Sequence, residues 1–103
     1  MRIGIMGAGG IGSVVGGLLS KAGHDITLID QWPEHVEKIR KDGLIVETRT
    51  EEHLTHPKAI HLHELQLETE PFDAAFIAVK SYDTEWATTM MLNYVDRKST
   101  RLN

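Results

Sequence analysis

The most constraining feature of this 103-residue chain is a cluster of glycines near its start, GAGGIG at residues 7–12. A short apolar run at Arg2–Met6 comes directly before it and is typical of a buried β-strand. After it, apolar residues recur at the spacing of one helical face until Gly23, a residue type common at helix C-termini. The chain must therefore begin with a strand, a tight glycine turn and a helix.

The pattern G-x-G-x-x-G in this position predicts a site for the pyrophosphate of a dinucleotide. The first glycine permits the tight turn, the second lets the backbone approach the phosphates, and the third lets the helix pack closely on the sheet. The helix N-terminus would add free N–H groups and a partial positive charge. The candidate cofactor-binding residues of the loop are Gly7, Ala8, Gly9, Gly10, Ile11 and Gly12. The alternative interpretation is a glycine-rich turn that binds no ligand.

A second candidate position follows the next predicted strand, His24–Ile29. Asp30 stands there, 18 residues after the last loop glycine. An acid at about this distance accepts hydrogen bonds from the adenosine ribose of NAD, and its charge repels the 2′-phosphate of NADP. Gln31 comes next, where an NADP-binding chain usually has an arginine, so we expect NAD to be slightly favoured over NADP. Two alternatives stay open: Asp30 is only a cap or turn residue, or Arg40 and Lys41 reach a phosphate.

The rest of the chain continues to alternate between predicted helices and strands. The expected elements are a helix from Pro33 with Trp32, Val36 and Ile39 on its apolar face, strands at 44–46 (extending to 47 or 48) and 59–62, a short helical turn at 63–67, a strand at 74–79 buried on both faces, and a helix at 84–94 with Trp86, Met90 and Tyr94 on one side. This alternation predicts the α/β class, with a Rossmann-type doubly wound parallel sheet. We expect the sheet to be incomplete, with an exposed apolar edge at its fourth strand.

The last eight residues break the pattern. Residues 96–103 (DRKSTRLN) are polar and basic where a doubly wound sheet would need its next strand. They look like an in-frame translation of a sequencing-library adapter, so we expect a non-native or disordered tail; an ordinary frayed terminus is the alternative. The expected organisation is therefore a partial N-terminal dinucleotide-binding domain at 1–95, followed by this tail.

Composition excludes several other functions. The chain has no cysteine, which rules out disulfide scaffolds, thiolate zinc sites, iron–sulfur clusters and cysteine nucleophiles. Its net charge of −4 and the lack of a basic run in its body disfavour nucleic acid as a partner. No apolar stretch approaches the length of about 18 residues that a membrane span needs, so we expect a cytoplasmic protein that does not contact membranes.

The histidines invite a metal hypothesis that the spacing does not support. His61 and His63 would share one face of a strand, and His53 and His56 lie three apart. No cysteine or carboxylate cluster accompanies them at a familiar ligand spacing, so we expect no metal site. A serine hydrolase is also disfavoured, because the chain lacks a G-x-S-x-G motif.

Several motifs together resemble the ketopantoate reductase (2-dehydropantoate 2-reductase) family. Besides the glycine loop, they are AGHDITLI at 22–29, DGL at 42–44, and FD at 72–73 followed by AVKSYDT at 78–84. The resemblance covers residues 1–95 and implies the N-terminal part of the cofactor-binding domain. It also implies that Lys80, after the late strand, lies beside the cofactor; the alternative is a strand-end lysine in solvent.

What the resemblance implies about activity is hydride transfer from a nicotinamide cofactor to the ketone of a small 2-oxo acid, in pantothenate and coenzyme A biosynthesis. Family members mostly use NADP and have a basic residue after the second strand, whereas this chain has Asp30 and Gln31. The catalytic residues and the helical substrate domain are expected beyond residue 103, so the chain alone should be inactive. A homodimer of the full-length protein is left open.

Three other functions share parts of this pattern. Another NAD-dependent hydroxyacid dehydrogenase would have the same loop and acid. A non-enzymatic nucleotide-sensing module would also have both. An adenylating enzyme of the ubiquitin-activating type would need an arginine-bearing segment after the second strand, and none is visible at 31–35.

Overall fold

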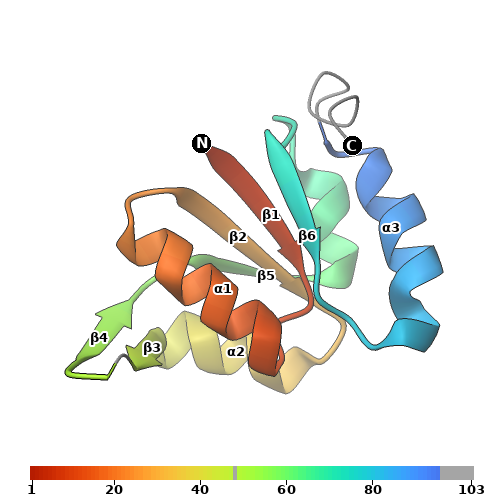
Figure 1. The fold of residues 1–103 in the computed structure, drawn as a ribbon. Helices are drawn as coiled ribbons and strands as arrows, with labels where there is room; N and C mark the ends of the chain where they lie inside the picture. Colours follow the sequence, from red (N-terminus) through yellow and green to blue (C-terminus); the bar gives the residue numbers. More distant parts are fainter. Residues whose placement is uncertain (48, 96–103) are drawn as a thin grey trace.

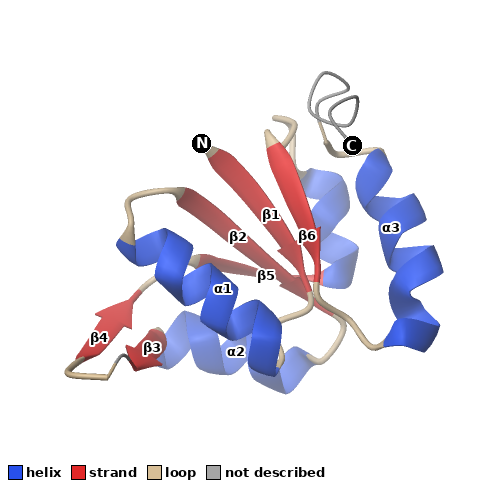
Figure 2. Cartoon of the chain, viewed as in Figure 1, coloured by secondary structure: helices blue, strands red, loops and turns tan. Residues whose placement is uncertain are grey.

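The computed structural model describes residues 1–47 and 49–95 (Figures 1 and 2). The elements in chain order are β1 (Arg2–Met6), α1 (Gly10–Lys21), β2 (Asp25–Asp30), α2 (Pro33–Asp42), β3 (Leu44–Glu47), β4 (Glu52–Thr55), β5 (Lys58–His61), the 3-10 helix η1 (Leu62–Leu67), β6 (Ala74–Ile77), the 3-10 turn η2 (Ser81–Asp83) and α3 (Thr84–Leu92). The tail that the sequence analysis assigns to 96–103 lies outside the described residues.

Four parallel strands form the main sheet in the order β5-β2-β1-β6 (Figure 1). β1 is central, and Ile3 pairs with Ile26 of β2 on one side and Ala74 of β6 on the other. The chain therefore builds the sheet outwards from β1 in one direction and then returns to its opposite side. This confirms the predicted α/β class with a Rossmann-type parallel sheet.

Alternating side chains of the central strands feed two separate cores, one on each face of the sheet. The core under α1 and α2 contains the buried residues Ile3, Ile5, Ala8, Ile26, Leu28, Val36, Ile39 and Ala59. The core under η1 and α3 contains Met6, Ile29, Ile60, Leu65, Phe72, Ala87 and Met91. Both faces of β1 and β2 are thus covered, which explains why their sequences are nearly continuous apolar runs.

Close packing of α1 explains its mid-helix glycines. A Cβ at Gly16 would lie 2.8 Å from the Leu28 Cδ2 atom of the sheet, and one at Gly17 would lie 2.2 Å from the Val46 Cγ2 atom of β3. Glycine costs a helix interior about 1 kcal/mol relative to alanine. Here it allows α1 to contact both the main sheet and β3.

The third strand of the parallel sheet differs from the prediction. β3 does not join the main sheet but pairs antiparallel with β4, and the next strand in the sheet is β5. The sequence predicts no strand at β4 (Glu52–Thr55). The predicted strand at 59–62 is β5 at Lys58–His61, and Leu62 already begins η1. The short β3–β4 hairpin is stabilised by Val46, which is buried beneath α1.

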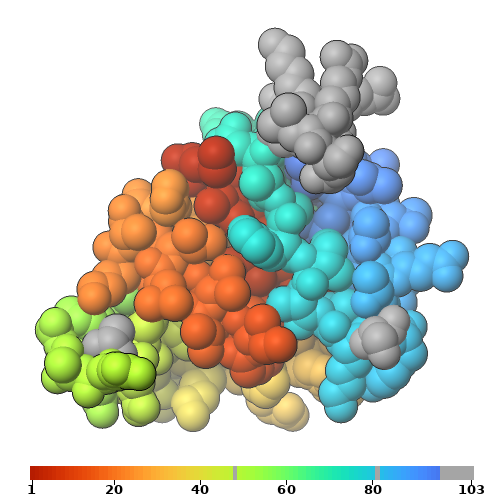
Figure 3. Space-filling view, in the orientation of Figure 1, coloured from red at the N-terminus to blue at the C-terminus, as the bar shows by residue number. Residues whose placement is uncertain are grey.

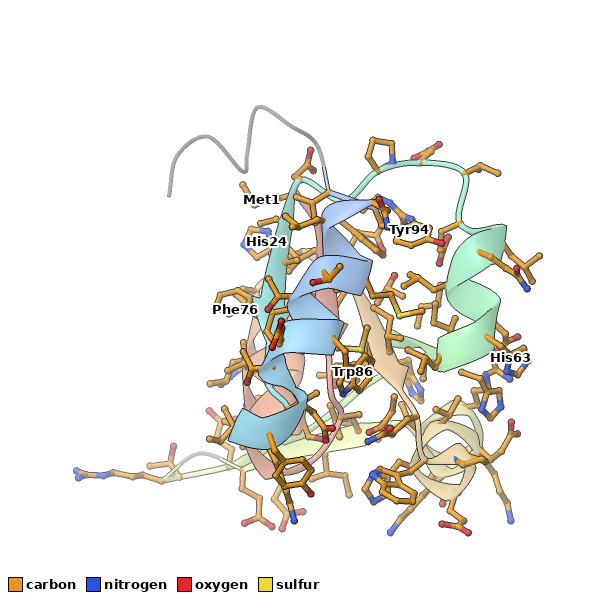
Figure 4. The ribbon with its side chains drawn as sticks, turned by 90° about the vertical axis from the view of Figure 1, so that its right-hand side faces the viewer. Met1, His24, His63, Phe76, Trp86 and Tyr94 are labelled. Carbon is orange, nitrogen blue, oxygen red and sulfur yellow. The ribbon has the colours of Figure 1, made fainter. Side chains whose placement is uncertain are left out.

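The expectation that 74–79 is buried on both faces is wrong. β6 ends at Ile77 and forms one edge of the sheet, and the Phe76 side chain is 47% exposed. Figure 4 shows Phe76 on the face of the sheet that carries α1, whereas Trp86 and Tyr94 project towards the opposite face. Among the described residues β6 pairs with β1 alone, so its other edge has no partner strand, which agrees with the predicted exposed edge at the fourth strand.

The predicted apolar faces of the two later helices agree only in part with the structure. In α2, Val36 and Ile39 are buried, but Trp32 before the helix is exposed. In the last helix, Ala87 and Met91 are fully buried. The predicted residues Trp86, Met90 and Tyr94 pack around that core as partly buried side chains.

An ionic cluster closes the start of β1. The Arg2 guanidinium lies over the Phe72 ring at 4.6 Å from its centroid and contacts the Glu68 carboxylate at 3.2 Å. Glu68, 10% exposed, also accepts a hydrogen bond from the Lys58 ammonium at 2.8 Å. Burial alone would raise the pKa of Glu68, but the hydrogen bonds and charges of Lys58 and Arg2 outweigh it and lower that pKa.

Candidate functional site

A crevice of about 410 Å³ opens at the carboxyl ends of β1, β2 and β6. Its lining residues are Met6, Gly7, Gly9, Ile29, Asp30, Gln31, Trp32, His35, Ala78, Val79, Lys80, Tyr82, Asp83 and Trp86. The crevice lies where the strand order reverses around β1. In open parallel sheets, ligands bind at this switch point.

The glycine loop forms one wall of the crevice and is held tightly to its neighbours. The Gly7 N–H donates a hydrogen bond of 2.7 Å to the Ile29 carbonyl at the end of β2. Gly7 has φ +108°, and a Cβ there would lie 2.5 Å from the Ala78 carbonyl oxygen. Figure 3 shows the start of α1 and the chain after β6 side by side on one face of the molecule. Only glycine can hold this turn between β2 and the segment that follows β6.

The two halves of the loop have opposite surroundings. A Cβ on Gly12 would lie 1.8 Å from the Gly7 carbonyl oxygen, so the backbone there has no room for a side chain. At Gly9 and Gly10, no atom lies within 4 Å of the point that a Cβ would occupy, so the outer side of the loop is open. The loop is therefore glycine-dependent for packing on its inner side and accessible on its outer side.

The helix that follows begins without a side-chain cap. Gly9 is the N-cap residue of α1, and the first intrahelical bond runs from the Ser13 N–H to the Gly9 carbonyl at 2.9 Å. The Ser13 hydroxyl donates to the Ala8 carbonyl and not to a helix amide. Amides of the first helical turn have no partner within a helix. Those of Gly10, Ile11 and Gly12 are thus available to an anion.

Asp30 joins the loop to the end of β2. Its side chain is 5% exposed, and its Oδ2 atom accepts a hydrogen bond of 2.9 Å from the Ala8 N–H. Its Oδ1 atom accepts one of 2.8 Å from the Trp32 N–H. The His35 Nδ1 atom lies 3.4 Å from Oδ2. A carboxylate with two oxygens can accept about four hydrogen bonds, so it retains capacity for a ligand's hydroxyl groups.

The predicted site residues fall into two groups. Gly7, Gly9, Asp30, Gln31 and Lys80 line the crevice. Ala8, Gly10, Ile11 and Gly12 belong to the same loop but do not line it. His35 lines the crevice as well, although it was not predicted as a site residue. It lies in the first turn of α2, and no motif in the sequence predicts its contact with Asp30.

Other crevice residues also escaped the sequence analysis as site candidates. The exposed side chains of Trp32 and Tyr82 stand at its rim. Asp83 is fixed there by a hydrogen bond of 2.8 Å from the Trp86 indole N–H. An aromatic residue two positions after Asp30 is a sequence signal that could have found Trp32.

Arg40 does not reach the crevice, which removes it as a phosphate ligand. Its Nε donates to the Ala59 carbonyl at 2.8 Å, and its guanidinium pairs with Glu64 at 2.5 Å and Glu37 at 3.4 Å. The backbone N–H of His61, together with Arg40, lowers the pKa of Glu64, which keeps this pair charged. Arg40 is therefore held against β5 and η1.

The histidine-rich segment assembles no metal site in the described part of the chain. The His61 and His63 rings stack with centroids 5.5 Å apart, and the His61 Nε2 atom lies 2.6 Å from Glu37. Among residues 1–47 and 49–95, no group of three or more potential ligands comes together. No helix in the same residues is long and apolar enough to cross a membrane.

Comparison with known sequences places this geometry in a family. The sequence profile described as ketopantoate reductase PanE/ApbA matches residues 3–102. A 2-dehydropantoate 2-reductase from Pyrococcus horikoshii is 40% identical over 85 residues, which cover 82% of this chain and 26% of that protein. One from Lactococcus lactis is 50% identical over 56 residues, which cover 54% of this chain and 18% of that protein.

Solved structures agree with the sequence match. A candidate 2-dehydropantoate 2-reductase from Enterococcus faecalis superposes with a TM-score of 0.82 at 35% identity, over 95% of this chain and 31% of that one. D-mandelate dehydrogenase with NADH and anilino(oxo)acetate gives 0.77 at 27% identity, over 93% and 30%. This chain thus spans less than a third of the length of these relatives. It belongs to the ketopantoate reductase PanE/ApbA family.

Proposed function

We propose that residues 1–95 form the dinucleotide-binding part of an NAD(P)-dependent reductase that acts on the ketone of a small 2-oxo acid. Family membership supports a nicotinamide cofactor. The crevice at the switch point of the sheet supports its place of binding. In this proposal the bound nicotinamide supplies the hydride, and the chain's own residues bind and orient the dinucleotide.

The glycine loop fits a pyrophosphate on structural grounds. Its outer side at Gly9 and Gly10 is free of neighbouring atoms, so phosphates can approach the backbone. The uncapped N-terminus of α1 offers N–H donors and the positive end of the helix dipole. Lys80 lines the opposite wall, and its ammonium makes no hydrogen bond or ion pair among the described residues. Because this charge faces the crevice without a partner there, we assign Lys80 to the cofactor side.

The observation that carries the cofactor choice is the buried Asp30 carboxylate, which is already fixed by the Ala8 and Trp32 amides. We infer that its remaining lone pairs accept hydrogen bonds from the ribose hydroxyls of NAD. A 2′-phosphate would put a second anion beside it. Like charges about 4 Å apart repel by roughly 4 kcal/mol at an effective dielectric of 20. Arg40 is held elsewhere and does not offset that repulsion, so NAD is favoured.

A second candidate function is an NAD-dependent dehydrogenase for a larger 2-hydroxy acid. The similarity to D-mandelate dehydrogenase with NADH favours it, together with Asp30 and Gln31 in place of a basic residue. The chain spans less than a third of the length of its relatives, so it does not choose between the two substrates. Assays of a longer natural form with 2-dehydropantoate and with an aryl 2-oxo acid would separate them.

The cofactor assignment is tested by titrating the protein with NADH and NADPH. We expect NADH to bind about ten- to thirtyfold more tightly, which is a difference of about 1 to 2 kcal/mol after solvent screening. Asp30→Ala should weaken NADH and improve NADPH. Asp25→Ala removes the same charge at the other end of β2 and should leave the ratio unchanged. Tighter binding of NADPH by the unmodified protein, or an unchanged ratio in Asp30→Ala, would contradict the assignment.

A further inference from the structure

His35 is the ionisable side chain next to Asp30. Its Nδ1 atom lies 3.4 Å from the Asp30 Oδ2 atom, and its side chain is 51% exposed. It lines the crevice and also the adjoining hollow between α1, α2 and β3. A single imidazole is thus in contact both with the buried carboxylate and with solvent that a ligand would displace.

The other charged groups around His35 are few. Lys38 and Asp42 from α2 line the adjoining hollow. Lys80 and Asp83, from the segment after β6, line the crevice. The glycine loop and the start of α1 contribute no ionisable side chain. Within the described residues, His35 is the only basic group in ion-pair distance of Asp30.

We propose that His35 is a specificity-determining residue whose protonation weakens the discrimination that Asp30 imposes against a 2′-phosphate. The inference rests on the proposed function. Neutral His35 leaves the Asp30 charge uncompensated, so a further anion is repelled. Protonated His35 forms an ion pair with Asp30 and offsets its charge. Histidine is the side chain whose charge ordinarily changes between pH 5 and 8, so the preference for NAD should be largest above neutrality.

The test uses ADP-ribose and its 2′-phosphate as probes, with the protein in its longest natural form. Both ligands contain the part of the cofactor that this site would hold, and neither depends on catalysis. Dissociation constants are measured calorimetrically at pH 6.0 and pH 8.0, with circular dichroism at each pH to verify folding. One unit charge about 4 Å away changes affinity about fivefold even in bulk water. We expect the preference for ADP-ribose to fall about three- to fivefold from pH 8.0 to pH 6.0.

Two substitutions separate His35 from the titration of the phosphate itself. His35→Gln retains a polar side chain without the charge, so only the smaller pH effect of the phosphate should remain. His35→Lys carries its charge at both pH values and should show the weaker preference throughout. His24→Gln, at the opposite end of β2, is the matched control and should behave like the unmodified protein (Figure 4).

The outcomes are distinguishable. If the folded protein binds both probes but the pH effect is the same in His35→Gln as in the unmodified protein, His35 has no role and only this inference fails. If the folded protein binds neither probe, both the proposed function and this inference fail. A pH effect lost in His35→Gln and kept in His24→Gln supports the assignment.

Discussion

Replacing each of three loop glycines by alanine should separate the role of the loop in folding from its role in binding. At position 12 the new Cβ would lie 1.8 Å from the carbonyl oxygen of Gly7 and 2.9 Å from its carbonyl carbon. Both are backbone atoms of a turn that Ile29 and Ala78 confine on either side. The clash can be relieved only by moving α1 away from the sheet.

The expected magnitude for Gly12→Ala is at the upper end of overpacking costs, about 3 kcal/mol or more. For a domain of about 100 residues, each kcal/mol lowers Tm by roughly 4–8 °C, so we expect a decrease of at least about 12 °C. Gly9→Ala and Gly10→Ala meet no neighbour and should change stability by less than about 1 kcal/mol. Position 10 starts the helix, so alanine there should be neutral or mildly stabilising.

The assay combines thermal unfolding by circular dichroism with titration by ADP-ribose. Gly9→Ala should retain its Tm and lose at least about tenfold in affinity, because its methyl group occupies the open side of the loop. Gly10→Ala adds a methyl group at the neighbouring open position, so its affinity shows whether the phosphates approach both glycines or Gly9 alone. A Gly12→Ala protein that melts like the unmodified one would refute the packing argument. A Gly9→Ala protein that binds normally would refute the proposed approach of the phosphates.

Two further predictions concern stability. The pKa of Glu68 is held below its ordinary value of 4.5. The contribution of Glu68 to the free energy of unfolding is therefore present above pH 4.5 and lost as the pH falls through the lowered pKa. The urea midpoint should drop on acidification from about pH 5 to pH 3, and Glu68→Gln should make this drop smaller. Thr27 is fully buried, and its hydroxyl has no hydrogen-bond partner among the described residues. Thr27→Val should therefore leave the free energy of unfolding unchanged or raise it by about 1 kcal/mol. Thr55→Val removes a hydrogen bond to the Leu44 carbonyl and should lower the free energy of unfolding by a similar amount. Equal urea midpoints for the two valine variants would contradict the second prediction.

Local periodicity predicted most of the elements along the chain and missed β4 and the pairing partner of β3, which depend on contacts between elements. β1, α1 and β2 agree with their predicted bounds to within a residue or two, and both faces of each strand are buried. The buried face of α1 is nevertheless formed by Gly12, Gly16 and Gly17. Ile11, Val14 and Leu18, which the apolar spacing placed on that face, are exposed. β3 was predicted as a strand, but β4 and the antiparallel pairing of the two were missed, because both strands are only four residues long and mostly exposed. A short strand with one buried side chain, such as Val46, carries no clear period.

The candidate site was likewise predicted only as far as local sequence reaches. The glycine loop, Asp30, Gln31 and Lys80 were singled out from their order along the chain, and the structure brings the loop, Asp30 and Lys80 around one crevice. That Arg40 is held by Glu64 could not be predicted, because the partner lies 24 residues away on another element. The contact between His35 and Asp30 could not be predicted either, because it depends on the angle at which α2 leaves β2.

The hydrogen bonds that tie the glycine loop to β2 make phosphate binding and ribose binding mechanically dependent on each other. Gly7 is anchored to Ile29, and Ala8 to the side chain of Asp30. A change at residue 30 therefore releases one of the amides that fix the loop as well as altering the ribose contact. Free-energy changes of residues in one network do not add. Substituting residue 30 alone should therefore gain less affinity for NADPH than removal of the charge would give by itself, and a compensating change within the loop would be needed to recover the difference.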